Sequence, residues 1–474
     1  MTVRFRDGWP HVSVVLLVPE LVAEHVTHGG QICLWADDDP AQQSASDIEN
    51  LWQRADEWAD AARAGFGPTD AALDAFAHFD SHATPIAELD LPSLSLTFTH
   101  GSMGVLYARQ HRLTLQLAAT HQCDTDLYGH WYAVDHVNPL PRTLNDIRNV
   151  LTAAQQRNLD RGLRRRDPQK HGGYDLLLLT WPRHQARESL VVTLSGAPPN
   201  VSAAAHQVTA TDTASLIARA GPDAEALRHK RVLLIGAGSV GGHLALAAAT
   251  SGIGRFAIAD NDTLLQVNVV RHVCGTEYVG WLKTDAVKHL IGEHAPATTV
   301  DTLAAVPLAP TALRAALADY DLVIDATGQA FITAVLAAIC AGAGIPLITV
   351  ALYHAGALLR VRRQAPTDTP LTARPGDPTY LQVPPDDPAT RDPGFLELGC
   401  LAPINNAPPT AAATAGALTA IIAVDLLTGR LEYPDETVQV LRPVSTAPFD
   451  RIGLITPKRA VTHPGPAPAQ SGLP

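Results

Sequence analysis

The sequence predicts an α/β protein whose C-terminal half is a doubly wound, mostly parallel sheet, a Rossmann-like domain preceded by α+β domains. Two observations carry this prediction. An apolar strand at 231–235 runs through a glycine-rich turn into an alanine-rich helix, and a second apolar strand then ends at Asp260. Strand and helix patterns alternate from there to residue 351, which is typical of parallel strands joined by helices.

The remaining elements of this half follow from apolar periodicity and from proline and glycine breaks. Helices are expected at Lys283–Glu293, Pro310–Ala318, Gln329–Ala341 and 410–429, and strands at Thr298–Leu303, Asp321–Asp325, Pro346–Ala351 and 436–444. The stretch from Gln364 to Pro409 is rich in Pro, Asp and Thr, and a loop of this length is usually functional or disordered. The expected organisation is a domain at 1–85, a domain at 86–220, a domain at 221–455 and an unstructured tail at 456–474.

The glycine turn predicts a nucleotide site. Gly236, Gly238 and Gly241 allow a sharp turn and a close approach of the backbone to a phosphate, which the N–H groups of the following helix attract. Asp260 at the end of the second strand can accept hydrogen bonds from the hydroxyls of a ribose. Many dehydrogenases share this pattern, and a glycine turn alone can also occur without any ligand.

Charged residues downstream of the second strand favour ATP over NAD. A pyrophosphate held by a helix start needs no further cations, whereas a triphosphate with Mg²⁺ does. A further strand ends at Asp325, close to Gly328. Taken singly, each charged residue could belong to an ordinary salt bridge, but that does not explain their order along the chain. The polar residues concerned are Asp262, Asn268, Arg271 and Lys283.

This ordered set resembles the ubiquitin-activating-enzyme-like adenylyltransferase superfamily (ThiF/MoeB/HesA-like), over about residues 225 to 440. The resemblance implies ATP-dependent adenylation of a carboxylate, with the C-terminal glycine of a ubiquitin-like protein as the acceptor. In this reading Arg271 and Lys283 neutralise the reacting phosphates, and Asn268 holds phosphate or positions its loop. Asp260 binds ribose, and Asp325 holds Mg²⁺ with Asp262 as a helper.

The resemblance also implies a second step, in which a thiol takes the acyl group from the adenylate. A thiolate on a mobile loop suits that step better than a buried thiol. Cys400 lies in the loop before the last predicted helix and is the candidate. Cys274 follows Arg271 closely and is expected to pack under the nucleotide loop, and Cys340 lies on an apolar helix and is expected to be core.

Residues 8 to 62 resemble a bacterial ubiquitin-conjugating-like domain that is truncated or degenerate. Cys33 follows a glycine turn and precedes an acidic loop, and a helix with one apolar face is expected at 46–64. The resemblance makes Cys33 a candidate for receiving the modifier. The H-P-N segment of such domains is missing, however, with only His25 and His28 close to the cysteine. A small buried thiol in a structural copy of the domain is the competing interpretation.

Residues 86–220 are interpreted as a connecting α+β domain. Strands are expected at 93–100, 104–119, 130–137, 174–182 and 188–196, and one polar helix at Thr143–Arg166. Several histidines lie in this region, but they show neither metal-ligand spacing nor a pattern of carboxylate partners. The connecting domain is therefore expected to set the geometry between its neighbours.

Composition narrows the function classes further. The net charge of −12 with scattered basic residues argues against nucleic-acid binding. No signal-peptide pattern and no uninterrupted apolar run of about 18 residues is found, so no membrane association and a cytoplasmic location are expected. The five cysteines form no C-x-x-C pair, so no structural zinc site is expected, which departs from many sulfur-carrier adenylyltransferases.

Relatives with this fused layout imply a bacterial conjugation pathway in antiphage defence, a homodimer, and a separate conjugating enzyme as a further partner. An arginine from a neighbouring subunit often reaches the phosphates in such enzymes, with Arg219 or Arg228 as candidates. Two other function classes stay open. One is an adenylyltransferase for a sulfur-carrier protein or small carboxylate without a thioester, and the other is an activating enzyme whose first domain only docks a partner.

Overall fold

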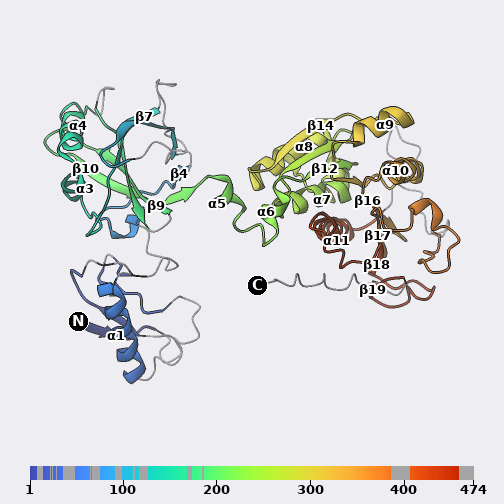
Figure 1. Ribbon diagram of the computed structural model, residues 1–474, viewed down its shortest axis with the longest axis horizontal. Helices are drawn as coiled ribbons and strands as arrows, with labels where there is room; N and C mark the ends of the chain where they lie inside the picture. Colours follow the sequence, from blue (N-terminus) through green and yellow to red (C-terminus); the bar gives the residue numbers. More distant parts are fainter. Residues whose placement is uncertain are drawn as a thin grey trace, which may run out of the picture. The chain divides into compact units, whose positions relative to one another are not determined.

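The chain divides into two compact units, Met1–Ser215 and Leu216–Pro474 (Figure 1). The computed structural model describes residues 1–7, 14–21, 23, 25–27, 29–35, 48–64, 66, 75–90, 99–109, 113–116, 126–167, 173–183, 186–385 and 406–457. The strand expected at 93–100, for the most part, and the tail beyond 457 lie outside these residues.

A small antiparallel sheet and one helix open the first unit. The sheet has the order β1 (Thr2–Arg4), β2 (Val15–Leu17), β3 (Gln31–Ile32). Helix α1 (Ile48–Ala64) buries Leu51 in a cluster with Leu16 and Ile32, and Trp58 packs at its edge. The predicted helix is confirmed, but its apolar face is packed only in part, because Ile48 and Trp52 are 54% and 38% exposed.

A larger mixed sheet forms the rest of the first unit. Among the described residues its order is β10-β9-β8-β7-β5-β6-β4-β11. Its elements are β4 (Ala87–Leu89), β5 (Met103–Arg109), β6 (Leu113–Gln116), β7 (Asp126–Ala133), β8 (Leu176–Arg183), β9 (Ala186–Ser195), β10 (Ser202–His206) and β11 (Val208–Ala210), with a 3-10 turn η2 (Ala75–His78). The stretch 104–119, expected as a strand, contains two strands, β5 and β6, paired antiparallel.

The prediction of a single helix at Thr143–Arg166 is wrong. The structure has two helices, α3 (Leu144–Val150) and α4 (Ala153–Arg164), with Leu151 in an extended conformation between them. Thr152 begins a second capping box, in which its hydroxyl accepts from Gln155 N–H and the Gln155 side chain accepts from Thr152 N–H. Reciprocal capping of this kind starts a new helix, and the polar sequence alone conceals the break.

The second unit contains the predicted doubly wound sheet. Its described strands lie in the order β14-β13-β12-β15-β16-β17-β18-β19, of which the first five are parallel and the last three antiparallel. They are β12 (Arg231–Ile235), β13 (Arg255–Ala259), β14 (Thr299–Leu303), β15 (Leu322–Asp325), β16 (Leu347–Tyr353), β17 (Leu358–Gln364), β18 (Glu436–Val440) and β19 (Gly453–Ile455). Neither β17 nor β19 is predicted, because three arginines interrupt the apolar pattern of β17 and β19 is short.

Helices cover both faces of this sheet, as the core clusters show. On one face lie α7 (Ser239–Thr250), α8 (Lys283–His294) and α11 (Pro409–Leu427), and on the other α9 (Pro310–Leu317) and α10 (Ala330–Ala343). Short helices α5 (Thr213–Ile217) and α6 (Ala224–Leu227) precede the sheet, and the 3-10 turns are η3 (Gln266–Asn268), η4 (Thr276–Tyr278) and η5 (Leu371–Ala373). The α/β fold class predicted from the sequence is confirmed.

Small residues let α7 and α11 approach closely. A Cβ on Gly416 of α11 would lie 2.7 Å from the backbone nitrogen of Leu244 in α7. Among the described helices, α11 is the one long and apolar enough to span a membrane by length and composition. Its residues Ala415, Ala420 and Ala423 are buried in the core cluster that it shares with α7 and the sheet. Its apolar character is therefore that of a core helix.

Candidate nucleotide-binding site

The glycine turn joins β12 to α7 at the carboxyl edge of the sheet. Gly236 has φ +95°, and a Cβ there would lie 3.0 Å from the backbone of Ala326 and Thr327. A Cβ on Gly241 would lie only 1.8 Å from the carbonyl oxygen of Gly236. Both glycines are needed because the backbone itself fills the space that a side chain would take.

Gly238 differs from these two glycines, because a Cβ there would meet no atom within 4 Å. It is the N-cap of α7 and provides no capping side chain. The first N–H groups of a helix have no partner inside the helix and carry positive potential. The open space in front of Gly238 is therefore suited to an anion such as a phosphate.

Asp260 connects the two loops that border this space. One carboxylate oxygen accepts a hydrogen bond from Ala237 N–H at 2.7 Å, and the other accepts from Asp262 N–H at 2.8 Å. Each oxygen of an ionised carboxylate has a second lone pair, so Asp260 can still accept from a ligand hydroxyl. The residue predicted to bind ribose lies beside the glycine turn and also holds its shape.

Lys283 and Asp262 form an ion pair near this edge of the sheet. The Lys283 ammonium lies 2.7 Å from the Asp262 carboxylate, and Lys283 N–H donates to the Asp262 carbonyl. The lysine side chain is 10% exposed, whereas that of Asp262 is 56% exposed. Lys283 is the first residue of α8, held in place by a backbone bridge between Thr263 and Leu282. A largely buried ammonium with a solvated partner can exchange that partner for a phosphate at little cost.

Asn268 has a structural role in the loop after β13. It is 8% exposed, and its side-chain oxygen accepts from Leu265 N–H at 3.0 Å, which closes the turn η3. Arg271, three residues later, is half-buried, and its N–H donates to the Asn268 carbonyl. Of the two roles considered for Asn268, positioning the loop is the one that these contacts support.

His272 is a site residue that the sequence analysis missed. Its Nδ1 accepts from Cys274 N–H at 3.1 Å, so its Nε2 carries the proton that it donates to the Ala237 carbonyl at 2.8 Å. Burial lowers the pKa of His272, and the charge on Lys283 lowers it further, which keeps the ring neutral. The neutral imidazole thereby holds the carbonyl of Ala237, the residue whose N–H donates to Asp260. Its position directly after Arg271 is the signal that could have identified it.

Asp325, predicted as the Mg²⁺ ligand, is 1% exposed. One of its oxygens accepts from Thr327 N–H at 3.0 Å and from the Thr327 hydroxyl at 2.7 Å, and the other accepts from the Thr333 hydroxyl. This donor set anchors the turn between β15 and α10. The oxygen that accepts only from Thr333 keeps a lone pair, so the role of Asp325 as a Mg²⁺ ligand stays a prediction. Among the described residues no group of three or more His, Cys, Asp or Glu could hold a metal.

The cysteines differ in exposure. Cys274 and Cys340 are buried as predicted, and burial raises the pKa of each thiol to about 12. Neither can supply a thiolate near neutral pH. Cys33 is half-buried, and its N–H donates to the His25 carbonyl at 2.8 Å. Cys400, predicted as the acyl-accepting thiol, and Cys123 lie outside the described residues.

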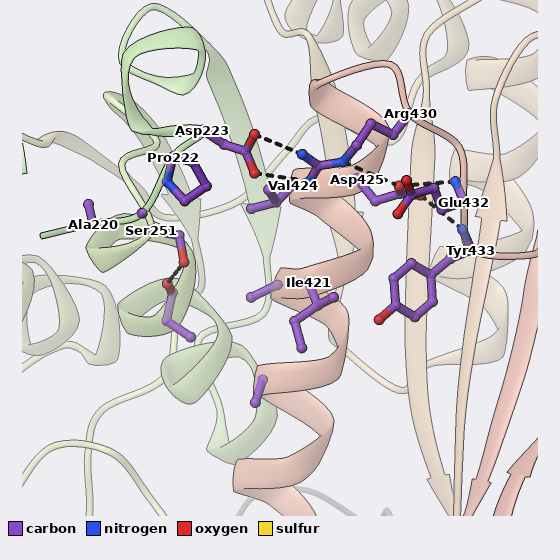
Figure 2. Close-up of a pocket in the computed structure, with 14 residues that line it drawn as sticks. Ala220, Pro222, Asp223, Ser251, Ile421, Val424, Asp425, Arg430, Glu432 and Tyr433 are labelled. Carbon is purple, nitrogen blue, oxygen red and sulfur yellow. Dashed lines mark hydrogen bonds and ion pairs between the residues drawn. The ribbon is translucent and has the colours of Figure 1, made fainter. Parts of the chain in front are cut away.

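A separate pocket of about 330 Å³ lies at the other end of α7. Apolar residues of α11, among them Ile421 and Val424, form one wall (Figure 2). Arg430 closes it with a bidentate ion pair to Asp223, at 2.8 and 2.9 Å. Ser251, at the C-terminal end of α7, lines this pocket, so the pocket is distinct from the site at the glycine turn.

Comparison with known proteins identifies the family to which the C-terminal half of the chain is similar. The model of the ThiF family matches residues 212–450. The chain is similar to adenylyltransferase and sulfurtransferase uba4 of Aspergillus clavatus (29% identical, 48% of this chain and 45% of the relative). It is also similar to molybdopterin-synthase adenylyltransferase of Escherichia coli (31% identical, 33% of this chain and 59% of the relative). Among solved structures, E. coli MccB is 18% identical over 51% of this chain and 66% of that chain, with a TM-score of 0.39. The matches thus span about half the length of these curated relatives.

Proposed function

The chain belongs to the ThiF family, and from this premise we propose that it catalyses the ATP-dependent adenylation of a protein or peptide carboxylate. The proposed acceptor is the C-terminal glycine of a ubiquitin-like protein. One observation carries the proposal: three features lie together at one edge of the sheet. They are the open N-terminus of α7 at Gly238, the carboxylate of Asp260, which can accept from a ribose hydroxyl, and Lys283, whose partner Asp262 is exposed. The names of the two adenylyltransferase relatives support the same chemistry.

The proposed reaction forms a bond between the carboxylate oxygen and the α-phosphorus and breaks the bond to pyrophosphate. Negative charge accumulates on phosphate oxygens as the leaving group departs. Lys283 would leave Asp262 and neutralise that charge, with Arg271 as the second predicted cation. ATP would enter with Mg²⁺ bound to its phosphates, so the ion is part of the substrate. Asp262, exposed and released from Lys283, would be available to such an ion as a helper to the predicted ligand Asp325.

We further propose that the Cys400 thiolate attacks the acyl adenylate, which forms a thioester and releases AMP, and that Cys33 accepts the acyl group next by thioester exchange, which frees the Cys400 thiol. The support is the position of Cys400 in the chain before α11 and the burial of Cys274 and Cys340. The named sulfurtransferase and molybdopterin-synthase relatives favour a second candidate, adenylation of a sulfur-carrier protein with no thioester. In a third arrangement the first domain only docks a separate conjugating enzyme.

Cysteine variants distinguish these functions. With ATP, Mg²⁺ and a ubiquitin-like protein, the wild type is expected to exchange labelled pyrophosphate into ATP and to form an adduct that reducing agents remove. Cys400→Ala is expected to keep the exchange and lose the adduct, because adenylation precedes thioester formation. Cys33→Ala is expected to lose only a second adduct. Exchange without any adduct in the wild type would favour the sulfur-carrier function, and absence of exchange with every candidate acceptor would contradict adenylation itself.

We also propose a homodimer formed through the segment between Asp262 and Lys283. This segment exposes several apolar side chains, which in a soluble monomer are seldom found together. They are Leu265, Val267, Val270, Val279, Trp281 and Leu282. A pairing surface beside the nucleotide edge would bring a partner arginine, such as the predicted Arg219 or Arg228, within its range. In this chain Arg228 pairs with Glu225 at 2.9 Å.

A charge-bearing double variant tests the dimer. Val267 and Val270 are 71% and 75% exposed, so replacing both by glutamate is expected to leave the fold intact and to convert the dimer into a monomer. Sedimentation velocity measures the change. Leu308→Glu, at an apolar residue 41% exposed elsewhere in the unit, is the matched control. A monomeric wild type, or a double variant that sediments like the wild type, would contradict this interface.

We place this activity in a cytoplasmic bacterial conjugation pathway that acts in antiphage defence. The support is the order of the predicted domains, with residues 1–85 ahead of residues 221–455. A plaque assay on cells that express the wild type or its Cys400→Ala variant, together with the neighbouring genes, tests the setting. Equal plaque numbers with and without the wild-type chain would contradict it.

A further inference from the structure

A row of side chains crosses the sheet of the second unit at the level where β12 ends. In the strand register Ile235 pairs with Asp325, Asp325 with Thr349, Thr349 with Arg362, and Arg362 with Glu436. Residues paired in register point to the same face of a sheet. Ile235 belongs to the core cluster of α9 and α10, so the row lies on that face. It begins beside the glycine turn and reaches Arg362 three strands away.

Arg362 is a cation with most of its donors unused. Its Nε donates to the Thr349 hydroxyl at 3.2 Å, and it forms no ion pair with any carboxylate among the described residues. A guanidinium has five N–H donors, so most remain for a ligand. The neighbouring carboxylate, Glu436, is fully buried and paired with Arg360, and it also accepts from Leu381 N–H.

This arrangement is costly for the protein alone. Burial lowers the pKa of the Arg362 guanidinium, and the charge on Arg360 lowers it further. The charge on Glu436 offsets this only in part, because that carboxylate is already paired with Arg360. A cation that is partly removed from water without an ion pair of its own destabilises the fold unless a ligand compensates for it. Such a residue at the edge of a reaction site points to an anionic ligand.

The distance along the row indicates which part of a substrate Arg362 can reach. Three strand spacings separate β12 from β17, which is about 14 Å. The arginine side chain covers part of this separation, and the rest corresponds to about two to four residues of extended chain. Arg362 is therefore too far along the sheet for the reacting carboxylate and close enough for the segment that precedes it.

We propose that Arg362 is a specificity-determining residue that binds an acidic side chain of the acceptor's tail, about two to four residues before the reacting C-terminus. The proposal rests on the proposed adenylation function, because it places that terminus at the glycine turn. It narrows the acceptor to proteins or peptides with an acidic residue close to a C-terminal glycine. Thr349 orients the Arg362 guanidinium through its hydrogen bond, and Glu436 pairs with Arg360, so that Arg362 is the arginine left for the ligand.

Labelled peptides test this inference directly. The probes are fluorescein-labelled ten-residue peptides that end in glycine and carry one glutamate, or glutamine in its place, at each of the five preceding positions. Fluorescence anisotropy with the full chain is expected to show about tenfold or tighter binding for glutamate over glutamine at one or two adjacent positions. Arg362→Met is expected to abolish this preference, and Arg362→Lys to retain part of it. Arg451→Met, at an exposed arginine of the same unit, is the matched control and should leave the preference unchanged.

Thermal unfolding separates ligand binding from a structural role. Because Arg362 has no ion pair of its own among the described residues, Arg362→Met is expected to leave the Tm unchanged or to raise it. A lower Tm in Arg362→Met, or equal binding of the glutamate and glutamine peptides by the wild type, would overturn the proposal. Pyrophosphate exchange is a separate measurement. Exchange without any glutamate preference contradicts the role of Arg362 alone, whereas a glutamate preference without exchange contradicts adenylation.

Discussion

Replacing Lys283 by alanine is expected to lower the rate of ATP–pyrophosphate exchange by about 10²–10³-fold, the loss typical when one group that stabilises transition-state charge is removed. The ammonium lies at the nucleotide edge and its partner Asp262 is mostly solvated. An exposed carboxylate that loses its partner is stabilised by water, so the free energy of unfolding should change little. The expected result is thus a catalytic defect in a folded protein, measured by labelled pyrophosphate exchange and thermal unfolding.

Lys288 provides the control for this experiment. It is an exposed lysine on the same helix, α8, so it has the same charge and the same helix propensity as Lys283. Lys288→Ala is therefore expected to exchange pyrophosphate at the wild-type rate. An equal loss in both variants would point to the net charge of the helix, and an unaffected Lys283→Ala would contradict the role of Lys283 at the phosphates.

The parallel half of the sheet could be predicted because each of its elements has a local signal. Strand β12 is a short apolar run, the turn after it requires Gly236 and Gly241, and β15 ends at Asp325 as expected. The strand β17 was not predictable in the same way. It carries buried leucines and arginines on both of its faces, so no alternating pattern marks it, and it pairs antiparallel with β16 and β18.

The site was predictable as a set of residues but not as a set of contacts. Charge and order along the chain identified Asp260, Asp262 and Lys283, and the structure brings the last two within 2.7 Å. The sequence also could not show that three local donors contact Asp325, the residue predicted to hold Mg²⁺. It also missed His272, because its role depends on the carbonyl of Ala237, 35 residues earlier in the chain.

Two glycines of the turn are expected to respond to alanine in opposite ways. Gly241→Ala would place a methyl group 1.8 Å from the Gly236 carbonyl oxygen, so α7 must move away from β12. We expect a loss of about 1–3 kcal/mol or more in the free energy of unfolding. Thermal unfolding should show this as a Tm lower by about 2–4 °C for each kcal/mol.

Gly238→Ala, in contrast, is expected to fold at least as well as the wild type. Its φ of −74° suits any residue, and its methyl group would meet no protein atom within 4 Å. The same methyl group would occupy the space in front of the helix start and hold a phosphate away from its N–H donors. Because a hydrogen bond to a charged group contributes about 1.5–3 kcal/mol, ATP should bind about tenfold more weakly or worse. Isothermal titration with ATP and a thermal melt of each variant measure the two effects. A methyl group at Gly238 contacts no protein atom, so only a ligand in front of the helix start can be affected by it. Equal ATP binding by Gly238→Ala and the wild type would therefore mean that the phosphates do not lie at this turn.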